Sequence, residues 1–161
     1  MNISESLNQM NNLSKRAEEV GRLLLSTGHK ICTVESVTGG GISELLTGVA
    51  GASSFFSRGF VCYSTISKYE MLKVPITIIR EYGVISAKVS ECMAKQGLLN
   101  VDEASIVVAC TGNAGPTALE DKPLGLVYIT CADRKGKTIT STDQFSGDRF
   151  KVREAAILKV I

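Results

Sequence analysis

Hydrophobic residues recur along this chain with two different periods, and segments of the two kinds alternate. Between residues 7 and 24 they follow one another at steps of three and four, which predicts an amphipathic helix that ends near Gly28. The apolar positions of this helix are Leu7, Met10, Leu13, Ala17, Val20 and Leu24. We interpret this stripe as a surface that packs against the rest of the chain, in preference to a site for a partner.

Five short runs of apolar and β-branched residues have the length and composition of strands. They cover residues 31–34, 55–63, 105–110, 124–132 and 138–145, and the last two runs form a hairpin around a polar turn. Further helices are expected over residues 42–46, 76–82, 87–99 and 149–161. Pro75 and Ser86 stand where they favour the start of two of these helices. This order of elements predicts an α/β fold, in which a mixed sheet has helices on both sides.

A turn rich in hydroxyl groups and glycine, residues 35–41, connects the first strand to the next helix. Its backbone N–H groups lie at the positive end of a helix dipole, where they can hold an anion or stabilise an oxyanion beside a serine nucleophile. Ser36 or Thr38 would equally fit a simple helix cap. Two more polar turns with glycine occur at residues 110–116 and 146–149, and three such turns together favour a site. Because ligands of open α/β sheets bind at the carboxyl ends of strands, we expect the first two turns to share one crevice.

Composition narrows the class of protein. The length of 161 residues suits one domain, which we place over residues 1–161. A net charge of +2 without a basic stripe gives no reason to expect nucleic acid as a partner. We expect no membrane partner, because no apolar run approaches the roughly 20 residues that cross a bilayer, and no signal or transit peptide, because the N-terminus is polar and acidic. The five cysteines form no Cys-x-x-Cys pair, which indicates reduced thiols, a cytoplasmic protein and no metal site.

Five short motifs occur in a fixed order along the chain, namely Val34–Gly40, Arg58–Ser64, Thr111–Pro116, Lys122–Gly125 and Phe145–Arg149. In this order they resemble the C-terminal domain of the competence-damage-inducible protein CinA, which also exists as a stand-alone nicotinamide-nucleotide amidohydrolase. The resemblance runs from about Leu7 to the end. It implies a three-layer α/β/α sandwich, whose sheet we expect to be mixed and mostly parallel. It also implies deamidation of nicotinamide mononucleotide to nicotinic acid mononucleotide and ammonia, and we expect no cofactor.

The chain departs from the family's usual residues at several places near these motifs. Val37 stands where the family usually has Cys, Thr65 where it has Asn, and Asn113 where it has a bulky aliphatic residue. Residues 117–119 replace further glycines, which removes flexibility from a loop that can close over a phosphate. We expect Val37 to be tolerated, and Thr65 and Asn113 to affect how the substrate fits.

Hydrolysis of an amide requires a nucleophile, a base, an oxyanion site and a proton for the departing ammonia. We expect Ser36 to be the nucleophile and the N–H groups of the glycine turn to form the oxyanion site, with Thr38, Gly39 and Gly40 binding the substrate. His29, the only histidine, stands seven residues before Ser36. That is roughly 20 Å along an extended strand at about 3.3 Å per residue, so His29 is excluded as the base within one subunit.

A lysine can take the place of the histidine, as in serine–lysine hydrolases. The resemblance places Lys68 and Tyr63 beside Ser36. An ordinary lysine is neutral in only about 0.04% of molecules at pH 7, so a lysine base needs burial among apolar groups. Tyr63 is expected to orient this lysine or to pass a proton. Without the resemblance, Lys68 would be interpreted as a solvated lysine on a helix.

The remaining predictions concern the substrate and its alternatives. We expect Thr111 and Gly112 to contact the nucleotide, and Arg149, at the start of a helix, to hold its phosphate together with free N–H groups. We also expect a homo-oligomer, a dimer or larger. One alternative is a sensor or scaffold that binds a nucleotide without hydrolysing it. A phosphotransferase is disfavoured, because the chain lacks both the Gly-x-x-x-x-Gly-Lys-Ser/Thr motif and a carboxylate pair for Mg²⁺.

Overall fold

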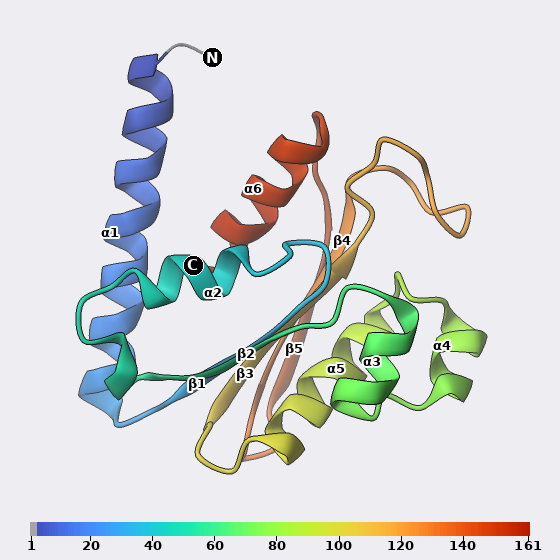
Figure 1. The fold of residues 1–161 in the computed structure, drawn as a ribbon, viewed down its shortest axis with the longest axis horizontal. Helices are drawn as coiled ribbons and strands as arrows, with labels where there is room; N and C mark the ends of the chain where they lie inside the picture. The colour runs from blue at the N-terminus through green and yellow to red at the C-terminus, as the bar shows by residue number, and fades with distance from the viewer. Residues whose placement is uncertain (1–2) are drawn as a thin grey trace.

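The computed structural model describes the backbone of residues 3–161 and the side chains of residues 11–161. Within this part of the chain, five strands form one sheet in the order β2-β1-β3-β4-β5 (Figure 1). The strands are β1 (Ile31–Glu35), β2 (Phe56–Val61), β3 (Ile106–Gly112), β4 (Leu126–Asp133) and β5 (Thr138–Gln144). All five expected strands are confirmed, with small differences at their ends.

The sheet is mixed, as predicted. β1 pairs in parallel with both β2 and β3, whereas β4 runs antiparallel to β3 and to β5. Four strands therefore run in one direction and β4 alone opposes them, but only two of the four strand pairs are parallel, so the expected mostly parallel sheet is confirmed in part. As a result, the carboxyl ends of β1, β2, β3 and β5 lie at the same edge of the sheet. An expected site residue lies at each of these ends or in the loop or helix that follows it.

Helices cover both faces of the sheet and complete the three-layer α/β/α sandwich (Figure 1). One face carries α1 (Ile3–Thr27), α2 (Gly41–Thr47) and α6 (Arg149–Val160), and the other carries α3 (Thr65–Leu72), α4 (Ile76–Tyr82) and α5 (Ala87–Asn100). A separate apolar core fills each side, with Ile42 and Phe55 fully buried in the first and Val34 and Met93 in the second. No described helix is both long enough and apolar enough to cross a bilayer.

Helix α1 follows the predicted stripe. Ala17 and Leu24 are buried, and Val20 packs against the core beneath α1. These positions therefore face the rest of the chain, as expected. Leu7 and Met10, which belong to the same stripe, lie outside the residues whose side chains are described.

Helix α3 was not predicted as an element from the sequence. Its only two buried side chains are Lys68 and Leu72, one turn apart. Because one of the two inward positions carries a lysine, the apolar period that marks an amphipathic helix is absent. The start of α3 is defined by Ser64, whose Oγ accepts a hydrogen bond from the N–H of Ser67 over 3.1 Å.

Candidate active site

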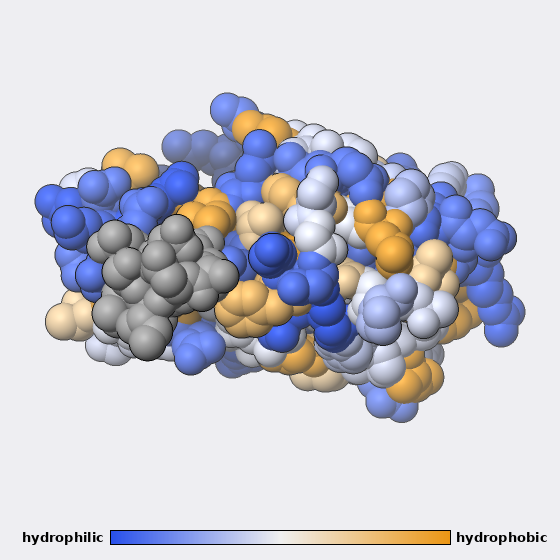
Figure 2. Space-filling view, turned by 90° about the horizontal axis from the view of Figure 1, so that it is seen from above, coloured by the Kyte–Doolittle hydropathy of each residue, from blue (hydrophilic) through white to orange (hydrophobic). Residues whose placement is uncertain are grey.

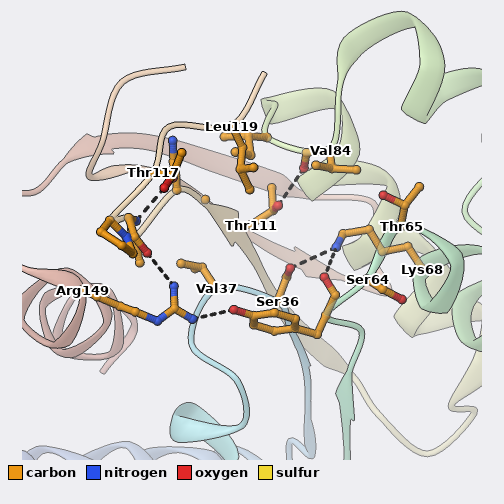
Figure 3. Close-up of a pocket in the computed structure, with 17 residues that line it drawn as sticks. Ser36, Val37, Ser64, Thr65, Lys68, Val84, Thr111, Thr117, Leu119 and Arg149 are labelled. Atoms are coloured by element: carbon orange, nitrogen blue, oxygen red, sulfur yellow. Dashed lines mark hydrogen bonds between the residues drawn. The ribbon is translucent and has the colours of Figure 1, made fainter. Parts of the chain in front are cut away.

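Ser36 lies where β1 ends and the chain turns toward α2. Its N–H donates to the carbonyl of Cys110 on the neighbouring strand β3 over 3.2 Å, which ties the start of the turn to the sheet. The residue is only 7% exposed and borders a cavity of about 470 Å³ at the carboxyl edge of the sheet (Figure 3). The hydroxyl of Ser36 is thus held in a nearly dehydrated place that a ligand can still reach.

The side chain of Lys68 reaches Ser36 from α3. Lys68 Nζ donates to Ser36 Oγ over 3.0 Å and lies 3.4 Å from the carbonyl oxygen of Tyr63 (Figure 3). It also donates to the carbonyl oxygen of Cys62 over 2.9 Å. These contacts orient the amine toward the serine from the end of β2. Lys68 is 1% exposed. The interpretation of Lys68 as a solvated lysine, which applied only when the resemblance was set aside, is therefore wrong.

Burial lowers the pKa of Lys68 from its ordinary value, because the charged form loses its hydration. Negative charge on Cys62, Cys110 or Glu120 would act in the opposite direction. Burial, however, raises the pKa of the Cys62 thiol to about 11 and also raises that of Cys110. Both thiols are therefore neutral near pH 7, and they leave burial as the dominant influence on Lys68.

The cavity is walled by the loops that follow β1, β2 and β3, by the segment between α4 and α5, and by the first residue of α6. Most of the site residues predicted from the sequence border it, namely Ser36, Tyr63, Lys68, Thr111, Gly112 and Arg149. Residues separated by more than a hundred positions in the chain thus meet in one place. The predicted crevice shared by the turns after β1 and β3 is confirmed.

Glu35, the last residue of β1, is a buried carboxylate that sequence analysis did not single out. Its two carboxylate oxygens accept hydrogen bonds from the hydroxyls of Thr38 and Ser43 and from the N–H groups of Gly40, Ile42 and Ser43. The donor–acceptor distances are 2.6–3.0 Å. The side chain is 0% exposed, so the chain itself supplies the anion at the start of α2. The sequence did offer one signal for this role, because Glu35 is a charged residue directly after the apolar run of residues 31–34.

This arrangement corrects one expectation. Thr38, Gly39 and Gly40 do not border the cavity, although they were expected to bind substrate. The Thr38 hydroxyl and the Gly40 N–H bind Glu35, and the Gly39 N–H donates to the carbonyl of Ser36. Among the described residues, the N–H of Val37 makes no hydrogen bond within the chain, whereas the backbone of Thr38 bonds the Cys110 thiol. Val37 borders the cavity, so its N–H is the one best placed for an oxyanion beside Ser36.

Arg149 joins two other parts of the cavity wall. Its guanidinium donates to the carbonyl of Gly115 over 2.9 Å and to the phenol oxygen of Tyr63 (Figure 3). The phenol of Tyr63 is therefore directed to Arg149, and only the main-chain carbonyl of Tyr63 contacts Lys68. The side chain of Asp148 caps α6 by accepting a hydrogen bond from the N–H of Lys151. Of the polar turn at residues 146–149, only Arg149 borders the cavity.

Thr111 and Gly112 form the part of the wall where β3 ends. The Thr111 hydroxyl donates to the carbonyl of Val84 over 2.7 Å and so connects the sheet to the segment between α4 and α5. At Gly112 a Cβ would lie 2.7 Å from the carbonyl oxygen of Leu126, so the close approach of β4 requires glycine. Both residues shape the cavity by their backbone, and the hydroxyl of Thr111 is already engaged.

His29 lies away from this cavity. His29 precedes β1 at the end opposite Ser36, where its Nδ1 lies 3.2 Å from the hydroxyl of Ser105. The exclusion of His29 as the base within one subunit is confirmed. Within the described residues, no three His, Cys, Asp or Glu side chains are grouped so that they could hold a metal ion.

Comparison with known proteins decides the family. The sequence model of the CinA C-terminal domain matches residues 13–161, almost the whole chain. The chain belongs to the CinA C-terminal domain family. This match confirms the family that the five sequence motifs had indicated, and the chain is called this CinA domain below.

Relatives and solved structures agree with this membership. Nicotinamide-nucleotide amidohydrolase PncC of Enterobacter agglomerans is 38% identical over 150 residues, which cover 92% of this CinA domain and 91% of that protein. The protein of the same name from Escherichia coli strain K12 is 39% identical over 145 residues, covering 89% and 87% of the two chains. The crystal structure of competence damage-inducible protein A from Klebsiella pneumoniae has a TM-score of 0.88 at 30% identity and covers 91% of each chain.

Proposed function

We propose that this CinA domain is an amidohydrolase that converts nicotinamide mononucleotide to nicotinic acid mononucleotide and ammonia. The contact that carries the proposal is the 3.0 Å hydrogen bond between Lys68 Nζ and Ser36 Oγ inside a ligand-sized cavity. Relatives of 38–39% identity named nicotinamide-nucleotide amidohydrolase support it.

In the first half of the reaction, Ser36 Oγ attacks the carboxamide carbon while the neutral amine of Lys68 takes the hydroxyl proton. The oxygen of the tetrahedral intermediate lies against the N–H of Val37. The intermediate collapses when the C–N bond breaks and the protonated Lys68 returns the proton to the leaving nitrogen, so that ammonia departs. An ester between Ser36 and the pyridine carboxyl group remains.

In the second half, water enters where ammonia left. Lys68 removes a proton from that water, which attacks the ester carbon, and the proton then returns to Ser36 Oγ as the C–O bond to the serine breaks. The products are free enzyme and the carboxylic acid, which releases its proton to the solvent and becomes the carboxylate. The low exposure of Lys68 favours this cycle, because burial increases the share of neutral amine at a given pH.

The charges around the cavity suit a nucleotide bound in one direction. Lys68 and Arg149 are the cationic side chains at its wall, and none of the bordering residues carries a carboxylate. The phosphate binds at Arg149, whose exposed guanidinium exchanges its contacts with Tyr63 and Gly115 for phosphate oxygens. The cationic pyridine ring then lies near Ser36 and favours the neutral form of Lys68.

The test is release of ammonia from nicotinamide mononucleotide by purified protein in the presence of a metal chelator. Stoichiometric or catalytic release supports the amidohydrolase, and a chelator should not reduce it. Binding of the nucleotide without ammonia in a single turnover would instead support the alternative, a sensor or scaffold. The expected homo-oligomer stays a prediction, which light scattering on the same sample checks.

A further inference from the structure

The loop between β3 and β4, residues 113–125, forms a strap along one wall of the cavity. Asn113 closes its base, because the side-chain amide of Asn113 donates to the carbonyl of Lys122 over 3.1 Å and its main-chain carbonyl accepts from the N–H of Gly125 over 2.7 Å. Asn113 is 2% exposed. An apolar residue at this position would leave the Lys122 carbonyl without this partner, so the departure from the family has a structural role here.

The tip of the strap is held by Glu120. Its carboxylate accepts hydrogen bonds from the N–H of Val84 over 2.8 Å and from the N–H of Ile85 over 3.1 Å, both in the segment between α4 and α5. A Cβ on Gly83 would collide with this carboxylate, so the cradle requires glycine. Glu120 therefore joins two walls of the cavity that are far apart in the sequence.

Leu119, next to Glu120, depends on this attachment for its position. It borders the cavity together with Val84 and Ile85, yet its side chain remains 56% exposed (Figure 3). Packing within the chain thus provides little to hold Leu119 in place. The two hydrogen bonds of its neighbour hold it against the apolar wall.

We propose that Glu120 is a positioning residue, which latches the strap to the segment between α4 and α5 and so completes an apolar wall for the flat ring of the substrate. The proposal rests on the proposed function. Glu120 does not border the cavity and makes no contact with Ser36 or Lys68 among the described residues. Its hydrogen bonds therefore act on substrate binding, whereas its negative charge acts on the chemical step only by raising the pKa of Lys68 from a distance.

The test compares Glu120→Gln with Asp121→Asn, each of which removes one negative charge from adjacent exposed positions. Asp121 makes no side-chain hydrogen bond among the described residues, so only the first variant disturbs the latch. A glutamine offers one acceptor oxygen and turns its NH₂ toward the other N–H donor. Both variants are made in a Ser36→Ala background, and calorimetry measures their affinities for nicotinamide mononucleotide and for nicotinamide riboside.

We expect Glu120→Gln to weaken both ligands by about fivefold, the effect of one typical hydrogen bond, while Asp121→Asn leaves both affinities unchanged. Amide hydrogen exchange at Val84 and Ile85 should accelerate in the first variant alone. In the background with Ser36 intact, KM should rise, and kcat should stay within about twofold when it is compared on the high-pH plateau, where Lys68 is neutral with or without the Glu120 charge.

Unchanged affinities despite faster exchange would overturn the proposal, as would a loss confined to the mononucleotide or a fall in kcat at constant KM. Unchanged exchange at Val84 and Ile85 would show that the latch does not form. A wild-type protein that binds both ligands without releasing ammonia would reject the proposed hydrolysis, whereas the affinity and exchange comparison would still decide the role of Glu120.

Discussion

Lys68 Nζ lies 3.0 Å from Ser36 Oγ, although the two residues are 32 positions apart and come from different elements. The serine follows a central strand, and the lysine lies on a short helix after the neighbouring strand. Parallel pairing of β1 and β2 brings the two loops to one edge, and the burial of α3 against the core directs the lysine inward. The pair is thus a product of strand direction and helix packing together.

Replacement of Ser36 by alanine should reduce ammonia release by at least about a thousandfold, because only binding and oxyanion stabilisation remain without the nucleophile. Affinity for nicotinamide mononucleotide should stay close to that of the wild type. Coupled detection of ammonia and calorimetry measure the two quantities, and the exposed Ser53 provides the control variant Ser53→Ala. Near-normal turnover in Ser36→Ala would exclude the seryl intermediate.

The pH dependence of the rate reports on Lys68. Since burial lowers the pKa of Lys68, the neutral base should form as pH rises through an apparent pKa below 10.4. The rate should therefore increase with pH across that range. Lys68→Arg keeps the charge but cannot lose its proton, so it should be almost as inactive as Lys68→Ala. An arginine variant with most of the wild-type rate would mean that the residue acts by charge alone.

The same pKa shift has a consequence for stability. The unfolded chain holds the Lys68 proton up to about pH 10.4, whereas the folded protein releases it at lower pH. Between these values the unfolded state binds more protons, so the free energy of unfolding contributed by Lys68 rises with pH. The free energy of unfolding of the wild type, minus that of Lys68→Met, should therefore increase with pH in that window, by at most about 1.4 kcal/mol per pH unit. Urea unfolding at several pH values measures it, and a difference independent of pH would contradict the buried, depressed lysine.

Glu35→Gln tests the carboxylate beneath the serine turn. The carboxylate accepts five hydrogen bonds on its two oxygens. A glutamine amide has only one oxygen, and its NH₂ group would face N–H or O–H donors at the other position. A loss of at least about 2 kcal/mol is expected, which corresponds to a fall of roughly 4–8 °C in Tm for a chain of this size. Glu44→Gln, at an exposed position of the same helix, should change Tm little. Calorimetric unfolding decides, and equal Tm values for both variants would deny Glu35 its structural role.

Arg149→Ala should separate the phosphate from the rest of the ligand. Charge-assisted hydrogen bonds are worth about 1.5–3 kcal/mol, so affinity for the mononucleotide should fall by roughly 10- to 100-fold. The riboside lacks the phosphate and should lose much less. Titration calorimetry with both ligands measures the difference. Similar losses for the two would place Arg149 at the ring, at the ribose or in the fold itself.

Local patterns were sufficient for most elements. The strands at the centre of the sheet and the helices that begin at Pro75 and Ser86 were predicted because each carries its own period or capping signal. Helix α3 has a cap in Ser64 but lacks the apolar period, since Lys68 takes one of its two buried positions. Because Lys68 occupies a core position of α3, the helix could not be recognised from its hydrophobic pattern.

The sequence by itself determined the class of fold, the family and most of the residues that meet at the cavity, because alternating periods and ordered motifs are local properties of the chain. Only the tertiary structure decided how these residues are used. Glu35 and not a ligand occupies the N–H groups at the start of α2, Tyr63 faces Arg149 instead of Lys68, and Glu120 reaches the segment after α4. Each of these contacts joins distant segments or competes with a ligand for the same donors. Such competition is settled by distance and burial in the folded protein, which residue types and spacings do not contain.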